Sequence, residues 1–231
     1  MDIIEICQKA HGAVDLSALV PTEREHIYKY KQGLSEFCYY KDFVFVEYHP
    51  ILDDTEMNSL QGVDRFHQRI DKHLNNNDYV NLFSIIEKKI ALPKYLEVFH
   101  QIPDEQKYDT FIEVYTRSEF GFEMLKDKYH EIFEYKDFSE ERKERLMNFY
   151  LQFSNKVKIY HGESFTFPVY DYYSWSTSKT VAKKFAYRFN GEGEIWEKLI
   201  PLKDAIDFID SRNEQEVLYD YQKEGKKCQQ K

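Results

Sequence analysis

The sequence predicts an α+β fold, in which a helical first half is followed by short strands. Up to about residue 155, apolar residues recur at spacings of three and four, which is the period of an amphipathic helix. Beyond that point, short segments of strand length are bounded by Gly, Pro, Asp or Asn. Helices first and strands later are typical of the α+β class. The chain has 231 residues, 42% of them hydrophobic, which is enough to bury a sizeable core.

The first half is expected to hold a strand followed by helices. Residues 43–48 read Phe-Val-Phe-Val-Glu-Tyr, a composition that favours extended structure. In residues 79–90, apolar side chains lie along one broad face, which predicts a helix. The cluster at residues 75–78 is expected to form a turn or a helix boundary, and Ser139 is a candidate N-cap. Further helices are predicted over residues 110–115, 120–133 and 140–153.

The second half is expected to form strands around one helix. The predicted strands cover residues 157–160, 193–201, 205–209 and 217–221. The helix covers residues 180–188, with Val181, Ala182, Phe185 and Ala186 facing inward. We therefore expect a mainly helical region over residues 1–154 and a strand-rich core over residues 155–231, either as two domains or as one continuous domain.

Charge and cysteine content narrow the class of protein. Lys and Arg number 32 and Asp and Glu 41, so the net charge is −9, which argues against a protein that coats nucleic acid but leaves a local basic groove open. Cys7, Cys38 and Cys228 form no C-x-x-C pair, so neither a zinc site nor a disulfide framework is predicted. No apolar run reaches the ~20 residues of a membrane span, and the first residues are too acidic for a secretory signal. We expect a soluble, cytoplasmic protein that makes no membrane contact.

Three short segments of the last third carry the candidate chemistry. They read Lys-Ile-Tyr-His-Gly at residues 158–162, Trp-Ser-Thr-Ser at residues 175–178, and Asn-Glu-Gln-Glu-Val-Leu-Tyr at residues 213–219. A strand delivers a polar ring, a Ser-Thr-Ser turn opens a basic helix, and a late strand begins with two carboxylates one residue apart. The sequence has no P-loop and no G-x-G-x-x-G, G-x-S-x-G or H-E-x-x-H pattern.

The order of these segments resembles the ADP-ribosyltransferase family, over roughly residues 156–221. In that family an early strand carries Arg or His, Ser-Thr-Ser follows, and a catalytic Glu lies near the end of the chain. The resemblance implies a split β-sheet core that consumes NAD as a substrate, without a Rossmann fold and without a metal. It also implies that Glu216 is the catalytic carboxylate and that Glu214 is its partner.

The chemistry of the reaction explains why carboxylates are wanted. Breaking the bond between nicotinamide and ribose develops positive charge on the sugar, which a fixed carboxylate stabilises. Glu216 is expected to hold a ribose hydroxyl. Glu214 is expected on the same side of an extended segment, because side chains in a strand alternate, and there it would orient or deprotonate the acceptor. The alternative is that both are solvated carboxylates at the edge of a strand.

The remaining candidates would bind NAD. The Tyr-His-Gly segment formed by Tyr160, His161 and Gly162 is more similar to the diphtheria-toxin and poly-ADP-ribose polymerase branch of the family. Members with Glu-x-Glu usually carry Arg at the position of His161. Histidine can bond a ribose or the dinucleotide backbone, and Gly162 would let the dinucleotide approach closely. A structural histidine is the alternative.

The Ser-Thr-Ser segment and nearby aromatic residues complete the expected site. One hydroxyl of Ser176, Thr177 and Ser178 is expected to brace Glu216 while another caps the following helix, with capping alone as the alternative. The aromatic candidates for binding NAD, by stacking on nicotinamide in the case of the first three, are Tyr172, Tyr173, Trp175 and Phe185. Ordinary core packing is the alternative. A basic patch that could attract the pyrophosphate or an anionic target, or form a solvated helix face, consists of Lys179, Lys183, Lys184 and Arg188.

These expectations describe an NAD-dependent mono-ADP-ribosyltransferase of toxin or effector type. The expected acceptor is a macromolecule, with a protein side chain favoured and RNA or DNA as the alternative, as for a toxin of a toxin–antitoxin or phage-defence system. An antitoxin or immunity protein is a candidate partner, and the helical half is a candidate for target recognition, a lid or partner docking. An NAD glycohydrolase and an inactive binding module are the remaining alternatives.

Overall fold

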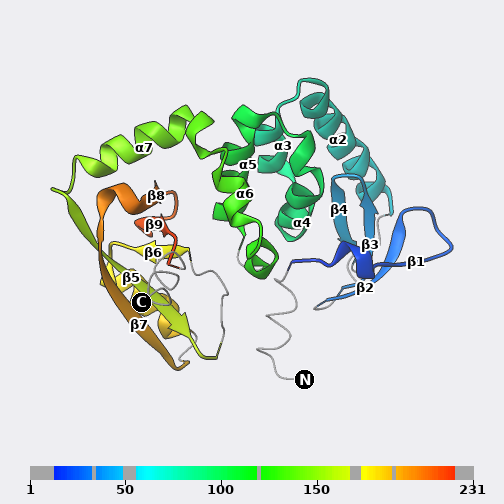
Figure 1. The fold of residues 1–231 in the computed structure, drawn as a ribbon. Helices are drawn as coiled ribbons and strands as arrows, with labels where there is room; N and C mark the ends of the chain where they lie inside the picture. Colours follow the sequence, from blue (N-terminus) through cyan, green and yellow to red (C-terminus); the bar gives the residue numbers. More distant parts are fainter. Residues whose placement is uncertain are drawn as a thin grey trace. The chain divides into compact units, whose positions relative to one another are not determined.

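The structure is a computed structural model that describes residues 13–32, 35–48, 56–118, 121–166, 173–188 and 191–221. It contains helices and two antiparallel sheets, which confirms the α+β class (Figure 1). The chain divides into two compact units. Unit 1 comprises Met1–Met124 and His130–Phe138, and unit 2 comprises Leu125–Tyr129 and Ser139–Lys231. No helix in the described ranges is long and apolar enough to cross a membrane.

Unit 1 begins with an antiparallel sheet in which the strands follow one another in chain order. The strands are β1 (Val20–Pro21), β2 (Ile27–Gln32), β3 (Ser35–Lys41) and β4 (Val44–Tyr48). The sequence predicted only the last of them, so the first half is not helical throughout. In β2, aromatic and charged residues alternate, and the sheet buries only some of its side chains, among them Tyr30, Cys38 and Val44. Asp42, with φ of +54°, forms the turn between β3 and β4.

Helices form the rest of unit 1. They are α2 (Glu56–Asn75), α3 (Tyr79–Ile85), α4 (Lys88–Val98), α5 (Asp104–Arg117) and α6 (Tyr129–Phe133), with 3₁₀ turns η1 (Leu16–Ala18), η2 (Phe99–Gln101), η3 (Phe122–Leu125) and η4 (Lys136–Phe138). The last residue of η3 and the first residue of α6 are counted in unit 2. The single helix expected over residues 79–90 is interrupted, because Ile86 is extended and Glu87 caps α4 by accepting from Lys89 N. The helix expected over residues 120–133 is likewise divided into η3 and α6.

Aromatic side chains form the core of unit 1. Phe83 and Phe111 are fully buried, and the ring of Tyr95 lies between them at centroid distances of 6.0 and 6.2 Å. The Tyr95 hydroxyl donates to the carbonyl of Lys107 at 3.1 Å, which satisfies the one polar group that this ring carries into the core.

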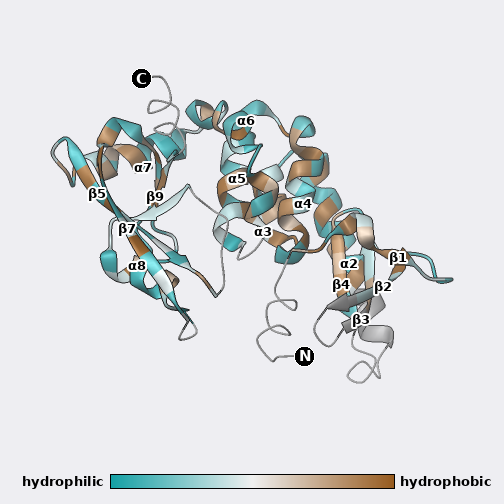
Figure 2. Ribbon diagram, turned by 60° about the horizontal axis from the view of Figure 1, so that its bottom comes forward, coloured by the Kyte–Doolittle hydropathy of each residue, from teal (hydrophilic) through white to brown (hydrophobic). Residues whose placement is uncertain are grey.

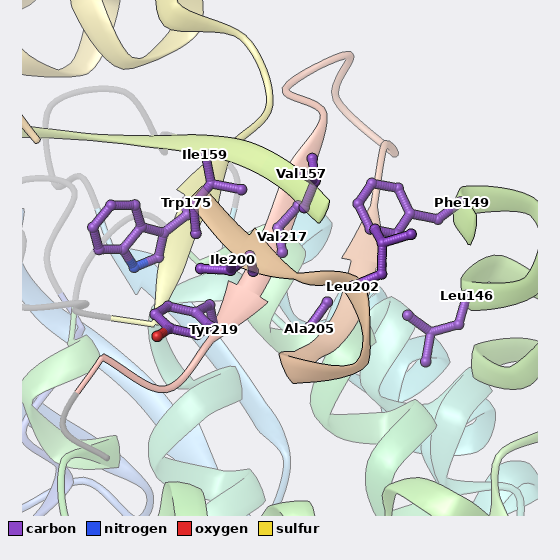
Figure 3. Close-up of a cluster of buried hydrophobic side chains, with 10 residues drawn as sticks. All are labelled: Leu146, Phe149, Val157, Ile159, Trp175, Ile200, Leu202, Ala205, Val217 and Tyr219. Atoms are coloured by element: carbon purple, nitrogen blue, oxygen red, sulfur yellow. The ribbon is translucent and has the colours of Figure 1, made fainter. Parts of the chain in front are cut away.

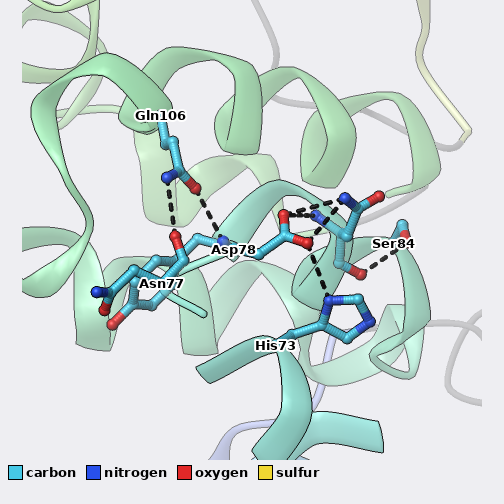
Figure 4. A network of polar contacts seen from close by, with 7 residues as sticks. His73, Asn77, Asp78, Ser84 and Gln106 are labelled. Carbon is cyan, nitrogen blue, oxygen red and sulfur yellow. Dashed lines mark hydrogen bonds and ion pairs between the residues drawn. The ribbon is translucent and has the colours of Figure 1, made fainter. Parts of the chain in front are cut away.

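The junction between α2 and α3 confirms the turn predicted at residues 75–78 (Figure 4). Asn77 has φ of +50°, and the Asp78 side chain caps α3. His73 Nδ1 lies 3.1 Å from Asp78 Oδ2. Gln106 binds both sides of the turn, because its amide donates to Asn77 O at 2.8 Å and accepts from Tyr79 N at 2.9 Å. This network fixes the chain reversal between the two helices.

Unit 2 contains a second antiparallel sheet with strand order β7-β5-β6-β9-β8. The strands are β5 (Lys156–Ser164), β6 (Ser174–Ser176), β7 (Gly193–Pro201), β8 (Ala205–Ile209) and β9 (Glu216–Tyr219). The predictions for β7 and β8 are confirmed at both ends. β5 extends further than predicted, to Ser164, because it pairs with β7 along its whole length. Hydrophobic and hydrophilic positions alternate along β5, as Figure 2 shows.

One face of this sheet, the core face, packs against α7 (Glu140–Tyr150). Phe149 of α7 stacks on Phe208 of β8 with ring centroids 4.5 Å apart and an interplanar angle of 14°. Ser139 caps α7 by accepting from Arg142 N at 3.0 Å, as predicted. Helix α7 therefore belongs to unit 2, so the boundary that the sequence placed after residue 154 lies before this helix. The buried cluster drawn in Figure 3 consists of Leu146, Phe149, Val157, Ile159, Trp175, Ile200, Leu202, Ala205, Val217 and Tyr219.

The opposite face, the α8 face, carries helix α8 (Lys179–Ala186). A Cβ atom added to Gly162 would lie 1.9 Å from the Ala182 carbonyl oxygen, and one added to Gly193 would lie 2.1 Å from that of Ala186. The two glycines therefore let the backbone of α8 lie directly on β5 and β7. Ala182 and Ala186 face the sheet as predicted, whereas Phe185, expected to face inward, is 39% exposed.

Candidate active site

Three candidate side chains and Glu197 form one row across the α8 face. Glu197 of β7 pairs with Tyr160 of β5, Tyr160 with Ser176 of β6, and Ser176 with Glu216 of β9. Directly paired residues of antiparallel strands project from the same face of a sheet. The strand register thus places Tyr160, Ser176 and Glu216 on neighbouring strands, although they are far apart in the sequence.

Glu216 is the first residue of β9, and only 6% of its surface is exposed. The Ser174 hydroxyl donates a hydrogen bond to Glu216 Oε1. Ser174 lies two residues before Ser176 on β6 and so projects from the same face as Glu216. Ser174 is not among the candidates that the sequence motifs indicate. The signal that could have found it is this two-residue spacing from the Ser-Thr-Ser segment.

Ser176, Thr177 and Ser178 hold the loop before β9 and start α8. The Ser176 hydroxyl donates to the carbonyl of Glu214 at 2.7 Å, and Thr177 N donates to the carbonyl of Gln215 at 3.0 Å. The Ser178 hydroxyl caps α8 by accepting from the third residue of the helix at 3.4 Å. The expected capping is therefore confirmed at Ser178. The hydroxyl that contacts Glu216 belongs to Ser174, which corrects the expectation that the Ser-Thr-Ser segment supplies it.

Glu214 lies outside β9, so the alternation of side chains along a strand does not place it on the same side as Glu216. Gln215 has φ of +48° and Asn213 has φ of +55°, so the chain turns through left-handed conformations before the strand begins. The Glu214 carboxylate pairs with Arg212, with Nη2 and Oε2 3.0 Å apart. The expected extended Glu-x-Glu segment is thus replaced by a turn that ends at Glu216.

His161 projects from the core face, opposite to the Glu216 side chain. Its Nδ1 lies 2.7 Å from the Ser174 carbonyl oxygen. Because a carbonyl can only accept, Nδ1 carries a hydrogen. The ring lies between Trp175 and Trp196, with centroids 5.4 and 5.9 Å away. His161 and Glu216 are therefore connected through Ser174, whose carbonyl bonds one residue and whose hydroxyl bonds the other.

The other predicted NAD-binding residues have different surroundings. The Gly162 backbone is covered by α8, so its lack of a side chain accommodates the helix, whereas the sequence prediction was that a dinucleotide approaches here. Tyr173 is 3% exposed, and its ring lies 4.1 Å from that of Tyr129. Trp175 belongs to the buried cluster, as Figure 3 shows. These contacts agree with the core-packing alternative for Tyr173 and Trp175, and Tyr172 lies outside the described residues.

Charged residues surround Tyr160 at the end of the row that lies on β5 and β7. Lys158 Nζ lies 2.7 Å from Glu197 Oε1, and Lys179 Nζ lies 3.7 Å from Glu197 Oε2. The hydrogen bond from Lys158 holds the pKa of the Glu197 carboxyl below its usual value, and the same contact raises the pKa of Lys158. Lys179 Nζ also lies over the Tyr160 ring, 5.8 Å from its centroid.

The described part of the chain brings no three His, Cys, Asp or Glu side chains together in a way that could hold a metal ion. The candidate residues that the structure brings together on the α8 face are the Glu216 carboxylate, the Ser174 hydroxyl that contacts it, and the charged residues around Tyr160. Comparison of the whole chain with protein-family models, with curated proteins and with solved structures gives no match.

Proposed function

We propose that this protein is an NAD-dependent mono-ADP-ribosyltransferase of toxin or effector type, which transfers ADP-ribose from NAD to a macromolecular acceptor. The observation that carries the proposal is the Glu216 carboxylate, buried at the start of a central strand and oriented by the Ser174 hydroxyl. A carboxylate held in one place, away from bulk water, stabilises positive charge that develops on a bound ribose. The order of the three segments around Glu216, which resembles that of the ADP-ribosyltransferase family, is a second support for the proposal.

The proposed reaction breaks the bond between nicotinamide and C1′ of the ribose. Nicotinamide leaves with the bonding electron pair as a neutral molecule, and positive charge develops on the sugar. Glu216 accepts a hydrogen bond from a ribose hydroxyl and opposes that charge. The acceptor then forms a bond to C1′ and releases its proton to a base, for which Glu214 is the nearest candidate in sequence.

Ser174 and His161 have supporting parts in this proposal. Ser174 orients the Glu216 carboxylate through its hydroxyl, and His161 holds the Ser174 carbonyl from the other face of the sheet. Both act as positioning residues. This arrangement explains a histidine at the position where Glu-x-Glu members of the family usually carry arginine, because the bond to a backbone carbonyl requires a donor and no fixed charge.

The acceptor is proposed to be a protein side chain, with RNA or DNA as the alternative. A second candidate function is an NAD glycohydrolase, in which water attacks C1′. Two observations favour this candidate. The turn at Gln215 removes Glu214 from the extended segment, and the Glu214 carboxylate, which would deprotonate a macromolecular nucleophile, is engaged in an ion pair with Arg212.

Labelled NAD tests the proposal directly. Wild type and Glu216→Gln are incubated with NAD labelled in the ADP-ribose moiety and a cell lysate, and the products are digested separately with protease and nuclease. Glu192→Gln, which changes an exposed carboxylate, is the matched control. Label that protease removes and that only wild type and the control transfer is the expected result. Removal by nuclease moves the acceptor to nucleic acid, and nicotinamide release without labelled macromolecules supports the glycohydrolase. Equal activity of Glu216→Gln would exclude the assigned carboxylate.

A further inference from the structure

Two lysines from different elements converge on one carboxylate of the α8 face. Lys158 lies on β5, Lys179 is the first residue of α8, and both contact Glu197 of β7. The three side chains are 51%, 55% and 44% exposed, so solvent reaches all of them. Two positive charges face one negative charge, which leaves an excess positive charge on this part of an otherwise acidic protein.

The position of this cluster relative to Glu216 follows from the strand register. Tyr160, over which Lys179 lies, pairs with Ser176, and Ser176 pairs with Glu216. Neighbouring strands lie about 4.8 Å apart, so Tyr160 is about 10 Å from Glu216 along the row. A lysine side chain is long enough to reach from Lys158 or Lys179 to a group that is bound over Tyr160.

This spacing and charge fit an extended anion whose sugar contacts Glu216. In NAD, the nicotinamide ribose is joined through its 5′ carbon to a pyrophosphate with two negative charges. With its ribose at Glu216, an NAD molecule that extends across β6 to β5 brings its pyrophosphate to Tyr160. The two lysines can donate charge-assisted hydrogen bonds to its oxygens once Glu197 is displaced.

We propose that Lys158 and Lys179 form the pyrophosphate-binding subsite, that Tyr160 forms its floor, and that Glu197 holds both lysines in place until the anion binds. This inference rests on the proposed function for the identity of the ligand. This subsite differs from the basic patch on α8 that the sequence indicates. It contains only one of the four residues of that patch, Lys179, and it adds Lys158 from β5.

The test measures ADP-ribose binding to the full chain by isothermal titration calorimetry. ADP-ribose keeps the pyrophosphate and lacks the bond that the enzyme would break, so its binding is independent of turnover. Lys158→Ala and Lys179→Ala are each expected to weaken binding about five- to tenfold at low salt, with a smaller effect at high salt. Glu197→Gln is expected to strengthen binding, because it removes the competing negative charge. Lys203→Ala, an exposed lysine of the same unit, is the charge-matched control and is expected to bind like wild type.

The outcomes separate this subsite from the proposed reaction. Weaker binding in both lysine variants with tighter binding in Glu197→Gln supports the subsite, even if no NAD is consumed. Wild-type affinity in both lysine variants, a loss confined to a Lys183→Ala/Lys184→Ala variant, or no ADP-ribose binding by wild type overturns it. NAD consumption with an unchanged KM in Lys158→Ala and Lys179→Ala would leave the proposed reaction standing and exclude the subsite. Adenosine, which lacks phosphate, should show no difference among the variants.

Discussion

Replacing Gly162 with alanine tests how α8 is attached to the sheet. The new Cβ would lie 1.9 Å from the Ala182 carbonyl oxygen and 2.8 Å from its carbonyl carbon, both of them backbone atoms that cannot rotate away. The shorter distance is about 1 Å less than the smallest separation that a real Cβ atom shows, so α8 must move away from β5. Overpacking of this kind typically costs about 1–3 kcal/mol, and the backbone obstacle places Gly162→Ala near 3 kcal/mol.

The assay is equilibrium and thermal unfolding, combined with amide hydrogen exchange of peptides from α8 and β5. For a chain of this length, a loss of about 3 kcal/mol corresponds to a melting temperature lower by roughly 6–12 °C. Gly62→Ala is the control, because a Cβ at Gly62 in the interior of α2 meets no atom within 4 Å. This control should stabilise its helix by about 0.5–1 kcal/mol, since alanine has the higher helix propensity.

The two substitutions are therefore expected to have opposite signs. Unchanged stability of Gly162→Ala, together with unchanged exchange protection in α8, would refute the close contact between helix and sheet. Loss of NAD binding without loss of stability would instead indicate that the dinucleotide approaches this glycine.

Four further predictions concern single side chains. Ser174→Ala should lower NAD consumption about 10- to 100-fold with the fold retained, whereas Ser176→Ala should mainly cost about 1 kcal/mol of stability; equal activity losses in steady-state assays would contradict these separate roles. Arg145→Leu removes the cation of an ion pair with Asp207, whose side chain is 0% exposed and whose Oδ2 lies 2.7 Å from Arg145 Nη2. Denaturant unfolding should show a loss of about 3 kcal/mol, and a neutral result would mean that the pair contributes nothing. Asp78→Ala should lower the free energy of unfolding by about 1 kcal/mol through loss of the α3 cap, whereas Asp78→Asn should be close to wild type in stability. Because the hydrogen bond from Asn81 lowers the pKa of Asp78, the stabilisation that its carboxylate contributes should be present above pH 3.8 and lost as the pH falls through the lowered pKa. Burial raises the pKa of the Cys38 thiol to about 12, so mass spectrometry at pH 8 should find Cys38 unmodified by iodoacetamide in the folded protein and modified after denaturation.

Local signals were sufficient for some elements. β7 and β8 begin and end where the sequence predicts, because Gly193, Pro201 and the polar residues after Ile209 mark their ends within a few positions. Ser139 and Asp78 were found for the same reason, since a cap depends on the side chain of one residue and the backbone of the next turn. Strands β1–β3 were not predicted. In β2, Tyr and Lys alternate, and such a segment forms a strand only when neighbouring strands supply the hydrogen bonds.

The sequence by itself determined which residues are candidates for chemistry: a late carboxylate, the serines before α8 and a histidine on an early strand of unit 2. Only the tertiary structure decided their relations. Strand register assigns the hydroxyl beside Glu216 to Ser174, places His161 on the other face, and brings Lys158 to Glu197 across 39 positions of sequence. The physical reason is that side-chain alternation is a property of one strand, whereas register depends on pairing between segments far apart in the chain, and a shift of one residue moves every side chain to the opposite face.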